Sequence, residues 1–448
     1  MDTLNDSQLE AFEAIRAGDN VFLTGAGGTG KSYLIEQIVK HIPLRIAVTA
    51  LTGCAALLLD CGAKTLHSWA GIGLGREDPL ILVQKIRKNS KAAKKWTGTD
   101  LLIIDEISMM TPELFEKLDQ IGRRIRKTDA PFGGIQLVCV GDFFQLPPIF
   151  REGETRFVFE SPFWKTTITK TIELKQIHRQ KDPAFQQILN EARFGRLTPE
   201  SAACLNARRG LDWKSQEIKP TLLFSRRAEV DAINEANLKA LGGERHTYTV
   251  ESVAITTTPG PNGGTQTTKP LSETEAAALK TEIEYMDKNA SYQAELTLAE
   301  GAQVMLICNL SQEDGLVNGS RGVITSFMGS GKNKLPMVRF MNGTDCLVSP
   351  HNWILEGGET RASKVVGRAQ IPLRLAYALT IHKAQGATLD CALIDIGSKT
   401  FEYGQAYVAL SRVKSLESLY VWEMNAAAIK AHPKVADFYK EIANSSSE

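Results

Sequence analysis

The feature that most constrains the fold is the glycine-rich stretch Asn20–Ser32, NVFLTGAGGTGKS. Residues Val21–Leu23 are apolar and favour a strand, and the apolar positions of Tyr33–Val39 repeat with the period of a helix. A strand, a glycine-rich turn and a helix in this order are the context in which G-x-x-x-x-G-K-[ST] predicts a P-loop. Because glycine lacks a Cβ, the backbone N–H groups of such a loop can surround phosphate oxygens.

Each part of this loop has a predicted role in binding a nucleoside triphosphate, ATP, with Mg²⁺. The start of the helix adds positive dipole and free N–H donors. Lys31 can reach the β- and γ-phosphates, and Ser32 can place its hydroxyl on Mg²⁺. A glycine-rich turn without a ligand is the alternative. The candidate nucleotide-binding residues of the loop are Gly25, Gly27, Gly28, Thr29, Gly30, Lys31 and Ser32.

Composition adds only broad limits. A chain of 448 residues, 43% hydrophobic and 23% charged, is typical of a globular protein with two or more domains. The net charge of +1 means that any affinity for nucleic acid must come from local basic patches. The seven cysteines form no C-x-x-C pair, so we expect reduced thiols and no zinc site.

Neither a membrane-spanning apolar run nor a signal peptide is apparent in the sequence. We therefore expect no membrane partner and an intracellular location. That location would be the nucleus or mitochondrion in a eukaryote and the cytoplasm in a bacterial or viral system.

Two carboxylates follow an apolar strand later in the chain. Asp105 and Glu106 come directly after Leu101–Ile104, which fits a Walker B strand. Asp105 would hold Mg²⁺ through water, and Glu106 would polarise the attacking water. Gln145 follows a further strand, Ile135–Val140, and could sense the γ-phosphate; a proline-terminated loop is the alternative.

The order of the elements predicts the architecture. Four strand–helix units in the first ~150 residues indicate a parallel α/β sheet with ligands at the carboxyl ends of its strands. Thr221–Phe224 and Ala228–Leu241 continue this pattern as a strand and a helix. Residues Ala254–Leu298 differ in composition, so we interpret them as an elaborated insertion or mobile loop. From Gly301 onward, short β runs separated by turns suggest a small barrel.

Several other residues allow two readings. Gln8, on a short helix, is a nucleotide contact or a solvated side chain, and position alone favours the latter. Thr52 and Thr65 suit backbone approach to phosphates or simple helix capping. Arg179 and Arg412 could stabilise charge on a γ-phosphate, whereas each taken singly fits a surface ion pair.

A basic run lies between these motifs. Residues Lys85–Lys95 contain six basic side chains and no acidic one. Such a run is either a solvated face or a patch that follows a phosphate backbone.

Taken in order, the motifs resemble the superfamily-one helicases, and most closely the PIF-type 5′→3′ DNA helicases. The residues that carry the resemblance are GAGGTGKS at 25–32, TLHS at 65–68, DEIS at 105–108, GDFFQLPP at 141–148, HRQ at 178–180, TIHKAQGATLD at 380–390 and GQAYVALSR at 404–412. Leu114–Arg126 resembles the signature helix of the PIF family. Residues 301–310 and 316–322 are similar to its inserted SH3-like barrel.

The resemblance implies an α/β fold with two RecA-like P-loop NTPase domains, a small wedge insertion and an inserted SH3-like β-barrel. The implied boundaries are 1–68 and 97–170 for domain 1A, 69–96 for wedge 1B, 171–245 and 371–448 for domain 2A, and 246–370 for domain 2B. ATP would bind between the RecA-like domains, and single-stranded DNA would cross both.

The resemblance also implies residue roles. Gln8 would contact adenine, and Arg179 and Arg412 would reach the γ-phosphate. The implied catalytic residues are Lys31, Asp105, Glu106, Gln145, Arg179 and Arg412. The implied DNA-binding residues are Thr52, Thr65, His67, Lys88, Lys91, Lys95, Thr380, His382 and Gln385. The last three of these would couple the state of the nucleotide to the grip on DNA.

Three positions depart from the family pattern. Gly27 stands where alanine is usual, and Leu51 replaces a common Ser or Pro. His178 replaces an aromatic residue and bears on how Arg179 packs.

The expected activity is ATP-driven movement 5′→3′ on single-stranded DNA, with unwinding of forked or structured DNA, by a monomer. An ATP-gated DNA-binding switch that hydrolyses ATP without unwinding is the alternative. A GTPase-like module is disfavoured because the sequence has no Asn-Lys-x-Asp motif.

Overall fold

The structure is a computed structural model of the chain. It describes residues 4–59, 61–73, 75–148, 154–215, 219–258, 265–311, 313–331, 334–359, 365–397, 400 and 402–445. Contacts divide the chain into two compact units. The first comprises Met1–Trp213, Leu222–Ser225 and Thr380–Glu448, and the second comprises Lys214–Thr221 and Arg226–Leu379. The four-part division expected from the sequence remains a prediction.

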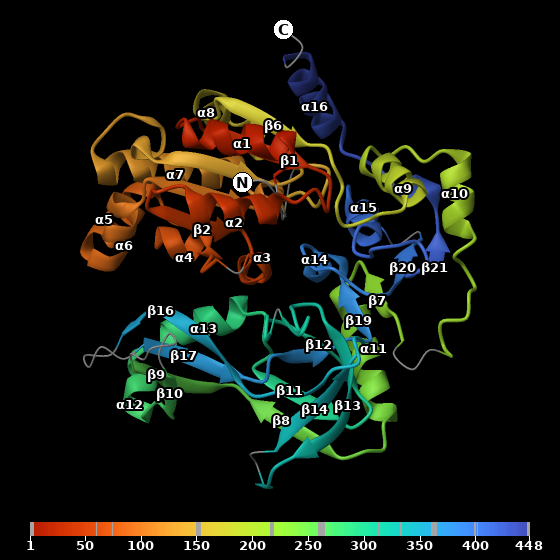
Figure 1. Cartoon of the computed structure of the whole chain (residues 1–448). Helices are drawn as coiled ribbons and strands as arrows, with labels where there is room; N and C mark the ends of the chain where they lie inside the picture. The colour runs from red at the N-terminus through yellow and green to blue at the C-terminus, as the bar shows by residue number, and fades with distance from the viewer. Residues whose placement is uncertain are drawn as a thin grey trace. The chain divides into compact units, whose positions relative to one another are not determined.

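The first unit contains a six-stranded sheet whose neighbouring strands all run parallel, in the order β3-β2-β4-β5-β1-β6. Its strands are β1 (Val21–Gly25), β2 (Ile46–Ala50), β3 (Lys64–Thr65), β4 (Leu101–Asp105), β5 (Gln136–Val140) and β6 (Lys170–Leu174). Figure 1 labels β1, β2 and β6 of this sheet. The parallel sheet predicted from the strand–helix order is confirmed.

Helices cover both faces of this sheet. They are α1 (Asp6–Arg16), α2 (Lys31–His41), α3 (Gly53–Leu58), α4 (Leu66–Ala70), α5 (Pro79–Lys88), α6 (Ser90–Gly98), α7 (Pro112–Arg126) and α8 (Pro162–Thr167), with the 3₁₀ turns η1 (Ile107–Met109), η2 (Pro131–Gly134) and η3 (Val158–Glu160). Because successive side chains of a strand alternate between faces, Leu102 and Ile104 enter one core and Leu101 and Ile103 the other. A strand buried on both faces is therefore apolar, as β4 is from Leu101 to Ile104, before it ends at Asp105.

A second sheet has the strand order β19-β7-β20-β21. Its strands are β7 (Thr221–Phe224), β19 (Ala378–Thr380), β20 (Ala392–Ile396) and β21 (Leu419–Met424), and β20 and β21 run parallel. The helices of this part of the chain are α9 (Pro183–Arg193), α10 (Pro199–Asn206), α14 (Ile381–Ala384), α15 (Gln405–Leu410) and α16 (Pro433–Ser445), with the turn η5 (Ala426–Ala428).

The last helix, α16, packs into a core of the first sheet. Val435 is fully buried there, and the ring of Phe438 stacks on Phe159 with centroids 4.1 Å apart. Phe438 also contacts Phe22 of β1 and Phe143, which follows β5. The sequence pattern gave no indication of this partner for the C-terminal helix.

The described residues of the second unit form three antiparallel sheets. They have the orders β15-β14-β13-β12-β18, β10-β9-β17-β16 and β11-β8. Their strands are β8 (Arg245–Thr249), β9 (Glu251–Thr258), β10 (Thr265–Pro270), β11 (Glu295–Ala299), β12 (Gln303–Leu306), β13 (Arg321–Met328), β14 (Leu335–Phe340), β15 (Asp345–Leu347), β16 (His351–Glu359), β17 (Val365–Gln370) and β18 (Leu373–Leu375). Its helices are α11 (Arg227–Ala240), α12 (Glu273–Ala278) and α13 (Lys280–Asn289).

The segment interpreted as an insertion or mobile loop, 254–298, is mostly helix and strand where it is described. It contributes most of β9, all of β10, α12 and α13, and most of β11. Residues 259–264 of this segment lie outside the described residues.

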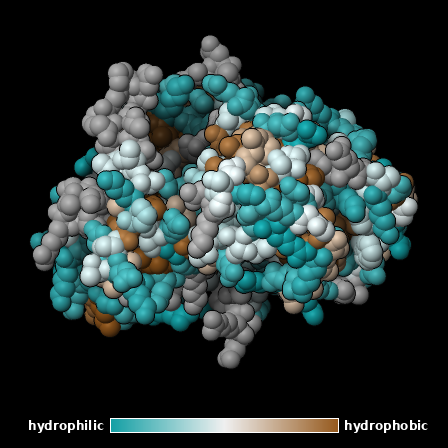
Figure 2. Space-filling model, turned by 90° about the horizontal axis from the view of Figure 1, so that it is seen from below, coloured by the Kyte–Doolittle hydropathy of each residue, from teal (hydrophilic) through white to brown (hydrophobic). Residues whose placement is uncertain are grey.

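The face drawn in Figure 2 is mostly hydrophilic, and the apolar residues on it form small patches. No helix among the described residues has the length and apolar character needed to cross a membrane.

Candidate functional site

The glycine-rich loop between β1 and α2 leaves no room for side chains at two positions. Gly28 has a φ of +89°, and a Cβ there would lie 2.6 Å from the Cβ of Arg179. Gly30 has a φ of +85°, and a Cβ there would lie 2.7 Å from Nε2 of Gln8. Left-handed backbone favours glycine, and both sites are also packed against other segments. The loop is thus fitted between the first helix and the segment that carries Arg179.

Lys31 begins α2 and bends back over the loop. Its Nζ donates to the carbonyl oxygens of Gly25 (2.7 Å) and Ala26 (2.9 Å). Burial lowers the pKa of Lys31, and the carboxylates of Asp142 and Glu106 oppose that decrease. An ammonium held over backbone carbonyls at the mouth of a P-loop is in place to bind phosphate oxygens.

The two carboxylates predicted from the sequence stand at the carboxyl end of β4. Burial, followed by the neighbouring charge of Glu106, raises the pKa of Asp105 to about 7, while Lys31 acts in the opposite direction. Glu106 has a left-handed backbone with a φ of +56°. Such a conformation is uncommon for a residue with a side chain and is frequent at functional sites.

Gln385, from the segment after α14, contacts Glu106. Its Nε2 donates to Glu106 Oε2 at 2.9 Å and lies 3.5 Å from Gln145 Oε1. Gln385 is 6% exposed, and its Oε1 has no hydrogen-bond partner among the described residues. This residue, expected at the DNA, therefore lies beside the catalytic carboxylate candidate.

Both arginines reach the P-loop. The Arg179 backbone N–H donates to Gly28 O (3.3 Å), and its Nη1 donates to Ser411 O (3.2 Å). Arg412 is 2% exposed; its Nε donates to Val408 O (2.7 Å) and its Nη2 to Ser411 Oγ (2.6 Å). Burial and the charge of Arg179 lower the pKa of Arg412 to about 9. The surface ion-pair reading is wrong: within the described chain, neither arginine pairs with a carboxylate.

These groups surround one cavity of about 270 Å³. Its lining residues are Gly27, Gly28, Gly30, Lys31, Ser32, Tyr33, Asp105, Glu106, Gly141, Gln145, Arg179, Gly386 and Arg412. All six candidate catalytic residues are among them. Of the loop candidates, Gly25 and Thr29 do not line the cavity, and Thr29 Oγ1 donates to Ala26 O at 2.9 Å.

Gln8 is not a solvated side chain, so the reading that position alone favoured is wrong. It is 2% exposed, and its Oε1 accepts from Asn5 N–H at 3.1 Å in a capping box that begins α1. Its Nε2 faces Gly30 of the loop. The capping box fixes the amide group beside the nucleotide loop.

The candidate DNA-binding threonines begin short helices. Thr52, Thr65 and Thr380 accept from the N–H groups of Ala55 (3.2 Å), Ser68 (3.3 Å) and Lys383 (3.3 Å). The capping interpretation of Thr52 and Thr65 is thus confirmed, while a DNA contact of all three threonines remains a prediction.

The two candidate histidines are partly buried. Burial lowers the pKa of both His67 and His382, which favours their neutral forms near neutral pH. Their DNA contacts also remain predictions.

The basic run lies on α5 and α6, and parts of it are engaged within the protein. Lys85 pairs with Glu77 at 2.7 Å, and Lys95 Nζ donates to Ser68 O at 3.2 Å. Lys88 and Lys91 are exposed.

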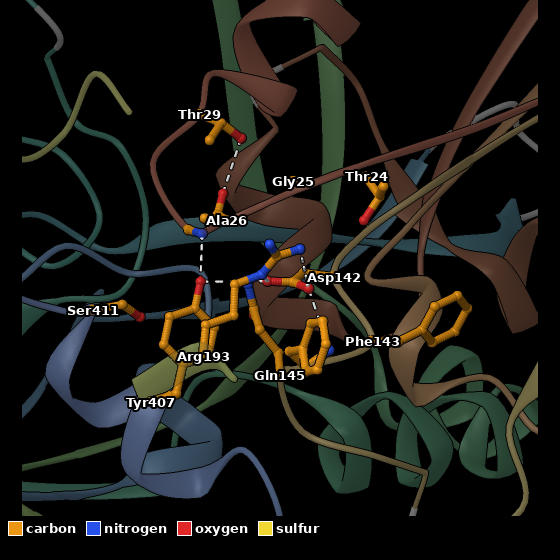
Figure 3. A network of polar contacts seen from close by, with 12 residues as sticks. Thr24, Gly25, Ala26, Thr29, Asp142, Phe143, Gln145, Arg193, Tyr407 and Ser411 are labelled. Atoms are coloured by element: carbon orange, nitrogen blue, oxygen red, sulfur yellow. Dashed lines mark hydrogen bonds and ion pairs between the residues drawn. The ribbon is translucent and has the colours of Figure 1, made fainter. Parts of the chain in front are cut away.

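Three residues that contact the loop or one another had no role predicted from the sequence. Asp142, Arg193 and Tyr407 form a buried polar network beside Ala26 and Gly27, which Figure 3 shows from close by. Asp142 and Tyr407 lie within motifs already recognised, but their spacing gave no sign that they meet.

Comparison with known proteins identifies close relatives. The profile of PIF1-like helicases matches residues 3–198, and that of the DNA helicase Pif1 2B domain matches residues 284–327. The ATP-dependent DNA helicase PIF1 of Emericella nidulans is 39% identical, over 98% of this chain and 63% of the relative. The chain thus spans less than two thirds of that curated relative.

Solved structures agree with this likeness. The crystal structure of Pif1 helicase from Candida albicans has a TM-score of 0.78 and 38% identity, covering 99% of this chain and 100% of that one. Pif1 from Bacteroides sp in complex with ADP-AlF4 has a TM-score of 0.77 and 26% identity, covering 99% and 97%. Bacteroides Pif1 bound to single-stranded DNA has a TM-score of 0.66 and 26% identity, covering 99% and 98%.

Proposed function

Because this chain belongs to the PIF1-like helicase family, we propose that it is an ATP-dependent DNA helicase that moves 5′→3′ along single-stranded DNA. It would unwind forked or structured DNA in genome maintenance. The observation that carries the proposal is that a P-loop lysine, a carboxylate pair and two arginines line the same cavity. The direction of movement rests on the family alone.

The chemistry of the cavity suits ATP hydrolysis. Glu106 would orient a water molecule and accept its proton, with Gln385 holding the carboxylate. Lys31, Arg179 and Arg412 would surround the γ-phosphate, whose oxygens carry the charge of a loose transition state. Guanidinium groups stay charged and offer paired donors to phosphate oxygens.

The donor set also fits Mg²⁺. Ser32 and Asp105 line the same cavity, and a hydroxyl with one carboxylate is a typical protein contribution when phosphates supply the other oxygens. The raised pKa of Asp105 reflects a buried negative charge that a cation would offset. A bound Mg²⁺ would neutralise charge on the β- and γ-phosphates.

We further propose two RecA-like domains, a wedge at 69–96 and an SH3-like barrel within 246–370. Support for the barrel comes from one core, in which Leu296 and Leu298 of β11 pack with Val304 of β12 and Val338 of β14. Support for the wedge comes from α5 and α6, which expose Lys88 and Lys91. Single-stranded DNA would pass Thr52, Thr65 and Thr380, and Gln385 would link that track to Glu106.

Comparing unwinding of duplexes with a 5′ or a 3′ single-stranded tail, in the presence of ATP, tests the proposal. We expect opening of the 5′-tailed duplex by the wild type and none by Glu106→Gln, which should still bind ATP because the amide fills the same space. Hydrolysis stimulated by single-stranded DNA without opening of either duplex would indicate the ATP-gated switch. Preferential opening of the 3′-tailed duplex would contradict the proposed direction.

A further inference from the structure

The P-loop is held by the hydroxyl of a tyrosine that does not line the cavity. Gly27 N–H donates to the Tyr407 hydroxyl at 2.8 Å, and that hydroxyl donates to Asp142 Oδ2 at 3.3 Å. Tyr407 belongs to α15, is 2% exposed and does not line the cavity. Figure 3 shows its ring pointing toward the loop at Ala26, with Asp142 beside the hydroxyl. Tyr407 thus contacts the loop without facing the space where the phosphates would lie.

A second tyrosine holds the strand that leads into the loop. The hydroxyl of Tyr439, on α16, lies 2.5 Å from Thr24 Oγ1 and accepts from Phe143 N–H at 3.4 Å. It donates to Asp142 Oδ1 at 3.4 Å. Because Thr24 precedes Gly25, the two tyrosines fasten the loop at its beginning and at its third residue.

One buried ion pair orients both hydroxyls. Asp142 is fully buried and accepts from Arg193 Nε (3.0 Å) and Nη2 (3.1 Å). The guanidinium carbon of Arg193 lies 5.0 Å from the ring centroid of Phe144 and 5.3 Å from that of Tyr439. A buried ion pair is stable only when further hydrogen bonds satisfy its remaining lone pairs, and on Asp142 the two hydroxyls and the Phe144 N–H (3.2 Å) supply them. Burial raises the pKa of both tyrosines, so they keep the protons that they donate to Asp142.

We propose that Tyr407 and Tyr439 are positioning residues for the phosphate cradle, held in place by the Asp142–Arg193 ion pair; this deepens the proposed function and rests on it. The loop binds phosphate through backbone N–H groups, whose directions depend on a backbone that has few side chains to fix it. Hydroxyls bonded to Gly27 and Thr24 supply that restraint from helices near the end of the chain. A cradle oriented before binding loses less conformational entropy when the nucleotide enters.

A purely structural role is the competing explanation, and tyrosine-to-phenylalanine variants separate the two. Tyr407→Phe and Tyr439→Phe keep the ring packing and remove one hydroxyl each. The matched control is Tyr377→Phe, because the Tyr377 hydroxyl is also buried and accepts from a backbone N–H, that of Gln303, at 3.2 Å. Tyr377 lies in the second unit and has no part in the cavity.

The experiment measures the affinity of the full chain for a fluorescent ADP analogue, the KM and kcat of DNA-stimulated ATP hydrolysis, and thermal melting. We expect Tyr407→Phe to raise both Kd for ADP and KM for ATP about fivefold, the typical effect of one lost hydrogen bond. The kcat should change less than about twofold, since the hydroxyl does not touch the reacting atoms. Tyr439→Phe should act in the same direction, and the double variant should deviate from the product of the two because both hydroxyls share Asp142.

ADP affinity equal to wild type in both variants, with melting lowered as in Tyr377→Phe, would overturn the inference. If Tyr407→Phe does not fold, Tyr439→Phe is tested alone, and an ADP affinity equal to wild type in that variant would overturn the inference. Failure of the proposed function appears elsewhere: wild-type protein that binds ADP but opens no tailed duplex would reject the helicase assignment and leave the ADP comparison valid. An unchanged ADP affinity in variants of an active helicase would reject only the positioning role.

Discussion

Replacing Gly28 with alanine should damage the nucleotide site by an amount that the structure allows us to work out. The new Cβ would lie 2.6 Å from Arg179 Cβ and 3.2 Å from Gln180 Oε1, so the Arg179 segment or the loop must move. A side chain at a φ of +89° costs roughly 1–2 kcal/mol, and overpacking of this kind about 1–3 kcal/mol. The sum of about 2–5 kcal/mol corresponds to at least a ~30-fold loss if it is expressed in catalysis.

The assay is DNA-stimulated phosphate release over a range of ATP concentrations, with a thermal melt of each variant. The control is Gly18→Ala, because Gly18 has a similar φ of +97° but no atom within 4 Å of the added Cβ. Gly18→Ala therefore introduces the strain of a left-handed backbone without a steric clash at the added Cβ. We expect kcat/KM to fall at least ~30-fold for Gly28→Ala and less than about threefold for Gly18→Ala.

Gly27→Ala provides the contrast within the loop. Its added Cβ would lie 3.5 Å from Ser411 and 3.7 Å from Arg412 Nη2, which is ordinary contact, and its φ is not left-handed. A fall in kcat/KM of less than about tenfold is expected. Near-wild-type activity of Gly28→Ala, or equal damage at Gly27 and Gly28, would refute the reasoning.

Three further predictions follow from the site. Arg412→Ala should reduce DNA-stimulated turnover at least about a hundredfold with little change in ADP affinity, because ADP lacks the γ-phosphate; a parallel loss of ADP affinity would indicate a structural role. Neutralising Lys88 and Lys91 should lower the log–log salt slope of single-stranded DNA binding by about 1.4, and an unchanged slope would assign them to a solvated face. The raised pKa of Asp105 means that the folded state binds a proton which the unfolded state has lost, so its contribution to stability falls as pH rises toward about 7. In nucleotide-free protein without Mg²⁺, Asp105→Asn should thus gain melting temperature relative to wild type between about pH 5 and pH 7, and a constant difference would contradict this.

The sequence alone identified the site residues whose position is determined by their neighbours along the chain. The P-loop is a strand, a turn and a helix within a few consecutive residues, and Lys31 follows from its place in that pattern. Asp105, Glu106 and Gln145 each follow an apolar strand. Because parallel strands present their carboxyl ends at one edge of a sheet, such residues converge whatever the rest of the chain does. Local pattern could not separate helix capping from DNA contact at Thr52, because both need the same hydroxyl.

Only the tertiary structure decided which distant residues complete the site. The sequence around Gln8 is typical of a surface residue, but in the structure Gln8 is buried because α1 packs beside Gly30. The sequence around Arg412 fits a surface ion pair, but in the structure Arg412 is buried and lines the cavity. The hydrogen bond from Gly27 to Tyr407 joins residues 380 positions apart, and the contact between Thr24 and Tyr439 spans 415. Hydrophobic periodicity and turn chemistry act over a few residues, so they specify strands, turns and helices. Which buried donor meets which acceptor depends on how those elements pack, and that is determined only when the whole chain has folded.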